Sequence, residues 1–199
     1  MQSNIVEIDL SVEPNRLNFA PRFNVAVTFI DRHLVEGRGD KVAIRTIDEE
    51  WSYKALSESV NQYGNYFLSL GIKPGERLMM VVRDCPDFIA MFFGAIKAGI
   101  IPAPVNTLLR SEDYSYLITD SECAGFFYSA QFAETLTPAL EASLHKPGHV
   151  VVAEDLARQV KTASGVLEAA ETNQMDDCFW LYSSGSTGNP KGVVHPHRS

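Results

Sequence analysis

The fold is decided by residues 77–105, which read RLMMVVRDCPDFIAMFFGAIKAGIIPAPV. The apolar run 77–82 predicts a buried strand. A helix is predicted at 86–98, because Pro86 stands in its first turn and Gly99 follows its end. The apolar run 100–105 predicts a second strand. A strand–helix–strand unit of this length is typical of a crossover connection between two parallel strands.

The same alternation continues on both sides of this segment. Upstream, the pattern predicts a helix at 22–36, two short strands at 42–47 and 51–53, and a helix at 53–70. Downstream, it predicts a helix at 111–120, a strand at 124–128, a helix at 131–144, a strand at 149–153, a weak helix at 166–171 and a last strand at 178–182. Strands that alternate with helices predict an α/β fold with a mainly parallel sheet and helices on both faces.

Capping and breaking residues mark several of these boundaries. Ser52 could cap the helix at 53–70, which Gly71 ends, and Ser111 could cap the next helix downstream. Pro138 is expected to bend or split the helix at 131–144, because proline lacks the backbone N–H that a helix interior requires.

The chain of 199 residues is long enough for one large domain or two small ones. We expect an extended lead-in at 1–21, an α/β subdomain at 22–153, a polar connector at 154–176, and a strand with a loop at 177–199. This last part would belong to a second subdomain that is cut short, so the sheet would be incomplete.

Charge and composition exclude several classes of partner. The formal net charge is −8, which disfavours nucleic acid and anionic membranes as partners. The apolar window 88–105 contains Lys97, Pro102 and Pro104, so a buried helix and strand explain it better than a membrane span. The three cysteines show no C-x-x-C pairing, which is typical of reduced thiols in a cytoplasmic protein.

The chemistry is concentrated in residues 182–195, which read YSSGSTGNPKGVVH. Glycines let a backbone approach an anion closely, hydroxyls donate hydrogen bonds, and a lysine adds a compact positive charge. The sequence therefore predicts a polyphosphate-binding loop. Its candidate residues are Ser183, Ser184, Gly185, Ser186, Thr187, Gly188 and Lys191. A flexible surface linker is the alternative, but linkers rarely follow an apolar strand directly.

Other nucleotide and metal motifs fit poorly. A Walker A loop needs a glycine followed by Lys and then Ser or Thr, whereas Lys191 lies three residues after Gly188 and precedes Gly192. No G-x-G-x-x-G motif of a dinucleotide site occurs. His195 and His197 have no third ligand nearby in the sequence, so we expect no metal site.

The loop at 183–191 resembles the Gly/Ser/Thr-rich loop of the adenylate-forming superfamily, which includes acyl-CoA synthetases, luciferases and peptide-synthetase adenylation domains. Three upstream segments are also similar to that family: WSYKAL at 51–56, LGIKPGER at 70–77, and FGAIKAG at 93–99 with its following Pro and Val-Asn. Glu76 stands where the family usually has Asp. Pro196-His197 stands where it often has Thr-His. VNTLL at 105–109, DYSYL at 113–117 and FWLYSSGSTG at 179–188 most resemble benzoate–CoA ligases.

This resemblance implies an activity and its partners. The chain would be the N-terminal fragment of an AMP-forming, ATP-dependent carboxylic acid–CoA ligase acting on benzoate or a related aromatic acid. Acyl-AMP would form first, and CoA would then displace AMP. ATP, Mg²⁺, CoA and the acid are the implied ligands, and the parent could be a homodimer. The loop would hold the β- and γ-phosphates.

In this family the acid pocket, the adenine site and the adenylation lysine lie downstream. We therefore expect no catalytic residue in these 199 residues, which should be inactive by themselves. The alternatives are a fatty acid–CoA ligase, a peptide-synthetase adenylation domain, a phosphate-binding module of another enzyme, or a noncatalytic interaction fragment.

Overall fold

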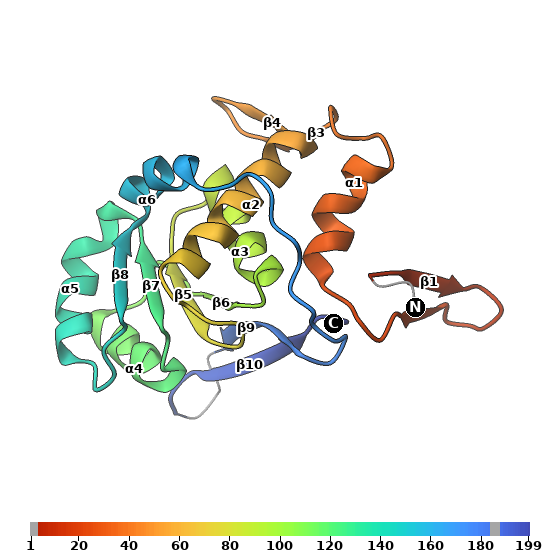
Figure 1. Ribbon diagram of the computed structural model, residues 1–199. Coiled ribbons are helices and arrows are strands. Elements are labelled where there is room, and N and C mark those ends of the chain that lie inside the picture. Colours follow the sequence, from red (N-terminus) through yellow and green to blue (C-terminus); the bar gives the residue numbers. More distant parts are fainter. Residues whose placement is uncertain (1–3, 184–187) are drawn as a thin grey trace.

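A computed structural model describes residues 4–183 and 188–199. Its centre is a parallel sheet of four strands in the order β6-β5-β7-β8 (Figure 1). The strands are β5 (Arg77–Val81), β6 (Ile101–Pro104), β7 (Gly125–Tyr128) and β8 (His149–Val152). The predicted parallel sheet is thus confirmed.

Helices cover both faces of this sheet, as predicted. One face packs against α2 (Tyr53–Ser69) and α3 (Pro86–Lys97), and the other packs against α4 (Ser111–Ser121) and α5 (Ala133–Ala142). Side chains alternate along a strand, so Leu78 and Met80 join the first core cluster while Met79 and Val81 join the second. All four of these β5 side chains are fully buried.

Helices α2 and α3 approach each other through two glycines. A Cβ added to Gly64 would lie 2.8 Å from the backbone oxygen of Gly94, and one added to Gly94 would lie 2.8 Å from the backbone oxygen of Val60. Since real Cβ atoms do not come this close, no larger residue fits at this crossing without moving a helix.

A buried charge sits beside this crossing. Lys97 Nζ lies 2.7 Å from Asp31 Oδ2 and donates to Asn61 Oδ1 at 2.7 Å. The lysine side chain is 4% exposed, so its ammonium depends on these partners in place of water. The contact joins α3 to α2 and to the helical segment η1 (Val27–Asp31), which α1 (Arg32–Val35) continues.

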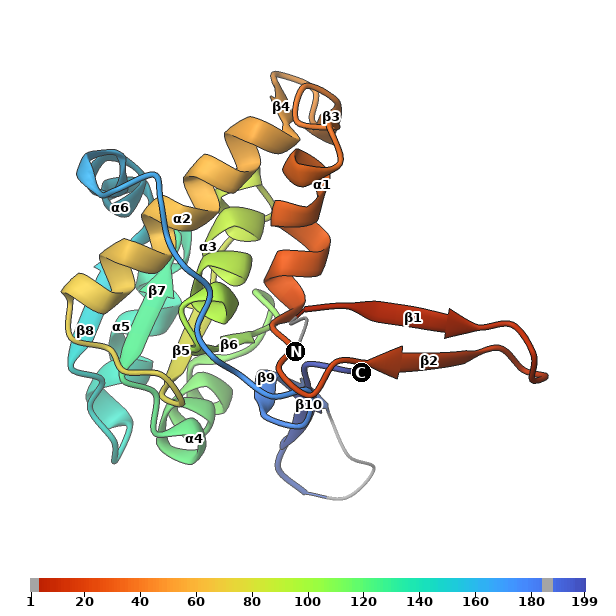
Figure 2. The ribbon, with the colours of Figure 1, turned by 45° about the vertical axis from the view of Figure 1, so that its right-hand side comes forward.

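Two hairpins lie outside the core. Strands β3 (Val42–Arg45) and β4 (Glu50–Ser52) form the predicted strand pair, and the Ser52 hydroxyl caps α2 by accepting from the N–H of Ala55 at 3.2 Å. The lead-in, predicted only as extended chain, contains a second hairpin formed by β1 (Val6–Asp9) and β2 (Arg16–Phe19). It projects away from the body of the molecule (Figure 2).

The predicted cap of α4 is wrong, and of the two alternatives predicted at Pro138 in α5 the split does not occur. Arg110, not Ser111, caps α4, because the Asp113 carboxylate accepts from the backbone N–H of Arg110 at 3.2 Å. Pro138 lies inside α5 and does not split it. Glu134, four residues earlier, is exposed together with Pro138, so water can satisfy the carbonyl that loses its helical donor. A short 3-10 turn, η2 (Ala130–Phe132), precedes this helix.

The helix predicted at 166–171 is also wrong. This segment runs as irregular chain along α2, and the Asn65 side chain donates to the carbonyls of Ser164 and Val166 at 2.8 and 2.9 Å. Helix α6 (Ala153–Gln159), with the turn η3 (Val160–Thr162), lies just upstream and was not predicted. Its buried Leu156 and Val160 pack into the first core cluster.

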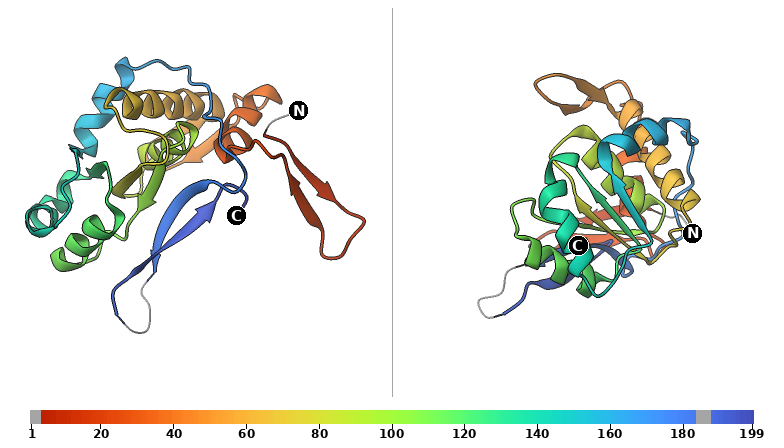
Figure 3. Two further views of the ribbon diagram at one scale, coloured as in Figure 1. Left: turned by 60° about the horizontal axis from the view of Figure 1, so that its bottom comes forward. Right: turned by 90° about the vertical axis from the view of Figure 1, so that its left-hand side faces the viewer.

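The last strands form a separate antiparallel hairpin of β9 (Asp177–Ser183) and β10 (Lys191–Pro196). Strand β9 confirms the predicted strand, whereas β10 was not predicted. Pro196 sits at a register shift in β10, a position where a strand tolerates proline. The left view of Figure 3 shows the hairpin extending from the body of the molecule.

Candidate phosphate-binding site

The predicted loop joins the two strands of the β9–β10 hairpin. Ser183 ends β9 and Lys191 begins β10, and these two residues are cross-strand partners. Both are exposed. Ser184, Gly185, Ser186 and Thr187 lie outside the described residues. Gly188 has a φ of +101° and no atom near its absent Cβ, a conformation that favours glycine.

The described ends of the loop carry side chains whose chemistry suits an anion. Cross-strand partners direct their side chains to the same side of a sheet, so the Ser183 hydroxyl and the Lys191 ammonium are neighbours. Among the described residues, no acidic side chain forms a salt bridge with Lys191. A hydroxyl and an ammonium side by side, next to a glycine-rich turn, supply donors for phosphate oxygens.

Tyr182, next to Ser183, faces the other side of the hairpin and reaches α4. Its hydroxyl donates to Asp120 Oδ2 at 2.8 Å, and its ring packs on the second core cluster. Burial and the nearby Asp120 carboxylate raise the pKa of this phenol. Tyr182 therefore remains a protonated donor at neutral pH.

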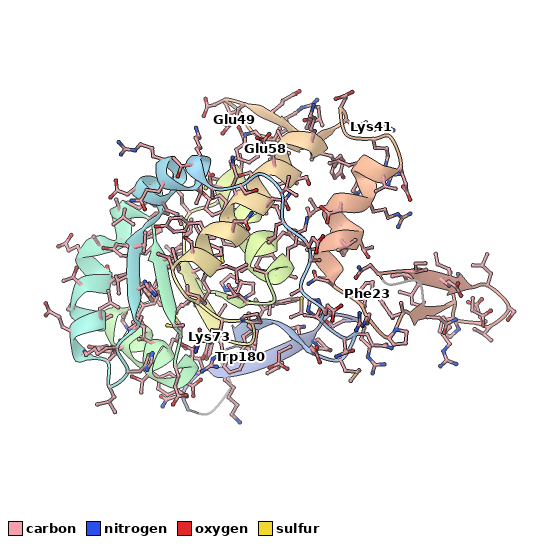
Figure 4. All side chains as sticks on the ribbon, in the orientation of Figure 1. Phe23, Lys41, Glu49, Glu58, Lys73 and Trp180 are labelled. Carbon is pink, nitrogen blue, oxygen red and sulfur yellow. The ribbon has the colours of Figure 1, made fainter. Side chains whose placement is uncertain are left out.

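Trp180 forms a second contact with the body of the molecule (Figure 4). The Arg77 guanidinium lies 5.6 Å from the centre of the indole ring, within range of a cation–π interaction. Arg77 Nε also donates to the carbonyl of Ser121 at 2.7 Å, so this guanidinium links β5, the end of α4 and the hairpin.

The root of the hairpin is buried. Phe179 packs edge-on against Phe92 of α3 with ring centres 5.5 Å apart, and His195 stacks on Phe179 at 4.6 Å. His197 is 2% exposed, and its Nδ1 accepts from the backbone N–H of Val25 at 3.2 Å. Both histidines thus have packing partners, and the described residues contain no group of three potential metal ligands.

The hairpin lies against β6, the outermost strand of the parallel sheet, and its Trp180 contacts Arg77 at the amino-terminal end of β5. In open α/β sheets, ligands usually bind at the opposite, carboxyl-terminal edge. That edge has its own pocket of about 200 Å³, whose lining includes Arg83, Ser129, Asp87 and Glu154. Two carboxylates and one guanidinium make this pocket a poor match for polyphosphate, so the hairpin remains the candidate site.

The sequence identified the loop but not what holds it. Asp120 and Tyr182 are 62 positions apart, and neither belongs to a motif that pairs them. The Arg77–Trp180 contact is likewise long-range. Free thiols were expected, and Cys85, Cys123 and Cys178 are unpaired. No helix in residues 4–183 and 188–199 has the length and apolar character needed to cross a membrane.

Comparison with protein families gives one match that spans most of the sequence. The family described as AMP-binding enzyme matches residues 31–199. The chain belongs to this family.

Individual relatives of this AMP-binding chain include aromatic acid–CoA ligases. Benzoate–CoA ligase of Thauera aromatica is 39% identical over 195 residues, which is 95% of this chain and 37% of that protein. The 4-hydroxybenzoate–CoA/benzoate–CoA ligase of Rhodopseudomonas palustris is 36% identical over 89% of this chain and 34% of its own length. The AMP-binding chain thus spans about a third of the length of these relatives.

A solved structure agrees with the fold. The anthranilate CoA ligase AuaEII, crystallised with anthranoyl-AMP, superposes with a TM-score of 0.84 and 30% identity. The match covers 90% of this AMP-binding chain and 35% of that protein. The sheet and its helices therefore form the same architecture as the corresponding third of a CoA ligase.

Proposed function

We propose that this chain is the phosphate-binding part of an ATP-dependent carboxylic acid–CoA ligase. The observation that supports this most is the cross-strand pairing of Ser183 with Lys191 at the two ends of a Gly/Ser/Thr-rich segment. Membership of the AMP-binding enzyme family supports ATP as the source of the phosphates that the loop would bind. The relatives named above suggest a CoA thioester as the product.

The loop would act in the first half-reaction. A carboxylate oxygen attacks the α-phosphorus of ATP, the bond from that phosphorus to the bridging oxygen breaks, and pyrophosphate leaves. Negative charge accumulates on the pyrophosphate during this step. Lys191 Nζ and the hydroxyls and backbone N–H groups of residues 183–188 would stabilise that charge and hold the leaving group in line.

Divalent metal would reach this site with the nucleotide. Mg²⁺ prefers oxygen ligands and is usually held by phosphates with one or two carboxylates. The candidate loop residues include no carboxylate, so they fit the phosphates and not the metal. Mg²⁺, when bound, would neutralise phosphate charge. Lys191 and the loop hydroxyls would supply the positive charge and the hydrogen-bond donors that come from the protein itself.

The substrate we infer is benzoate or a related aromatic acid, which an AMP-forming ligase would couple to CoA. This finer assignment rests on the benzoate ligases of Thauera aromatica and Rhodopseudomonas palustris. The three unpaired cysteines fit a reducing compartment, from which we infer a cytoplasmic enzyme.

The test measures carboxylate-dependent ATP–pyrophosphate exchange by the parent protein that carries this sequence. Lys191→Ala should lower the exchange rate by about 10²–10³, because one contact to the developing charge is lost. The thioester half-reaction from supplied acyl-AMP should change far less. Lys161→Ala, which removes an exposed lysine of η3, is the matched control and should retain the parental rate.

Three results would count against the proposal. One is unchanged exchange in Lys191→Ala, and another is equal loss in both half-reactions, which would indicate a folding defect. The third is full CoA-ligase turnover by the 199-residue chain alone, since the proposal assigns it only the phosphate-binding part. Benzoate should support faster exchange than a long-chain fatty acid, and the reverse order would reject the aromatic substrate.

A further inference from the structure

The β9–β10 hairpin lies against the body through β9, which runs close to the outermost strand β6, and through side chains. Within the described residues, the hairpin forms its own two-stranded sheet and shares no ladder with the four-stranded sheet. Cys178 and Phe179 anchor its root against α3, and Trp180 contacts Arg77 midway. Nearest the loop, the contact with the body is Tyr182 on Asp120.

Both strands of the hairpin take part in the packing around Tyr182. Gly192 lies opposite Tyr182 in the register. A Cβ added to Gly192 would lie 3.4 Å from Tyr182 Cε1 and 3.4 Å from Trp180 Cε3, which is tighter than most real contacts. The aromatic rings therefore lie over the bare β10 backbone, and fixing the Tyr182 ring fixes both strands.

Asp120 supplies the other half of the contact. It lies near the end of α4, where Oδ2 accepts from Tyr182 at 2.8 Å and Oδ1 accepts from Tyr116 at 3.3 Å. A carboxylate repels phosphate, so Asp120 is not suited to be a ligand of ATP itself. Its effect on a phosphate site would have to pass through the tyrosine.

We propose that Asp120 is a positioning residue for the phosphate-binding loop, and that it acts through the Tyr182 hydroxyl. The hydrogen bond holds the last described pair before the loop, Ser183 and Lys191, at a fixed place relative to α4. Removing it loosens the hairpin tip, because this is the hydrogen bond to the body nearest the loop among the described residues. The role in adenylation rests on the proposed function, whereas the restraint on the hairpin does not.

The restraint is tested first, by hydrogen exchange on the 199-residue chain. Tyr182→Phe and Asp120→Ala should each speed exchange of the β9 and β10 amides by about three- to tenfold, a modest factor because Asp120 is exposed. Exchange in β5 should stay unchanged. Asp120→Asn keeps an acceptor oxygen and should restore the wild-type pattern. Tyr116→Phe is the matched control. It removes the other hydroxyl that is bonded to Asp120, and Tyr116 forms no hydrogen bond with the described residues of the hairpin.

The role in adenylation is tested with the same variants in the parent protein. Tyr182→Phe and Asp120→Ala should raise the KM for ATP in pyrophosphate exchange by about three- to tenfold, with the KM for the carboxylate unchanged. The thioester half-reaction from acyl-AMP should be unaffected. Because Asp120 acts through Tyr182, the double variant Asp120→Ala/Tyr182→Phe should be no worse than either single variant.

The outcomes separate the two proposals. Unchanged hairpin exchange in Tyr182→Phe overturns the restraint, and faster exchange with an unchanged KM for ATP overturns the positioning role. Additive losses in the double variant show that Asp120 acts by another route and also overturn it. If the unsubstituted parent shows no carboxylate-dependent exchange, the proposed function fails, while the hydrogen-exchange result still decides the restraint.

Discussion

Acidification should destabilise this fold through one buried histidine, His197. Its ring is 2% exposed, and Nδ1 accepts from the backbone N–H of Val25 at 3.2 Å. The neutral ring therefore carries its proton on Nε2. A second proton would have to sit on Nδ1, where it would face another donor. Burial lowers the pKa of His197 from 6.5 to about 4, against the weaker opposing effect of Asp176.

The size of the effect follows from this difference in pKa. In the unfolded chain His197 binds a proton as the pH falls below about 6.5, whereas in the folded chain it does so only near pH 4. Titration of His197 therefore does not reduce the free energy of unfolding above about pH 6.5. Below that pH the free energy of unfolding decreases, and the decrease continues until the pH reaches about 4. At 1.36 kcal/mol for each pKa unit, the largest loss in the free energy of unfolding is about 3 kcal/mol, and about 2 kcal/mol of it occurs by pH 5.

Urea unfolding followed by tryptophan fluorescence measures this loss. The free energy of unfolding is compared at pH 7.5, 6 and 5 for wild type and for His197→Asn, which keeps an acceptor near Val25 but cannot titrate. The variant will be less stable at pH 7.5, but the gap to wild type should narrow by about 2 kcal/mol at pH 5. His149→Asn, in the part-exposed strand β8, controls for loss of a histidine. Parallel pH curves for wild type and His197→Asn would refute the reasoning.

Two further predictions concern the contacts around α2 and α3, and both are measured by urea unfolding. Lys97→Met should cost about 2–4 kcal/mol, because it leaves the partly buried Asp31 carboxylate without its cation, whereas Arg45→Ala in an exposed ion pair should cost under about 1 kcal/mol. Equal costs would show that Lys97 is not a buried ion-pair partner. Gly94→Ala should cost about 1–3 kcal/mol by forcing α3 from α2, and Gly39→Ala, with 3.9 Å of clearance, should stay within about 1 kcal/mol. A neutral Gly94→Ala would mean that the helices can separate freely.

Much of the sheet and its covering helices could be predicted because their signals are local. The period of apolar residues, Pro86 at the start of α3 and Gly99 after its end require no knowledge of the rest of the chain. The Ser52 cap is equally local, since its hydroxyl bonds an amide three residues away. The exception at Arg110 arose because two polar residues competed for the same helix start, and the Asp113 side chain decided between them.

The elements that the sequence did not predict depend on partners outside their own segment. Strand β10 begins with Lys-Gly and ends at a proline, so its pattern is weak, and only pairing with β9 makes it a strand. Helix α6 has little apolar periodicity, and burial of Leu156 in a core formed by other segments stabilises it. Residues 166–171 have helical character, but Asn65 of α2 donates to the carbonyl of Val166 at the start of this segment, which runs as irregular chain.

The candidate site also has some features that the sequence predicts and others that only the tertiary structure shows. The sequence by itself was enough to predict which residues would meet a polyphosphate, because hydroxyls, glycines and a lysine are close in the chain and their chemistry does not depend on the fold. It also determined the family, through a motif of consecutive residues. Only the tertiary structure decided that Ser183 and Lys191 are paired and that Tyr182 rests on Asp120. The Ser183–Lys191 pair depends on the register between two strands, which the residues of the loop do not specify. The Tyr182–Asp120 contact joins residues 62 positions apart, and only packing of the whole chain brings them together.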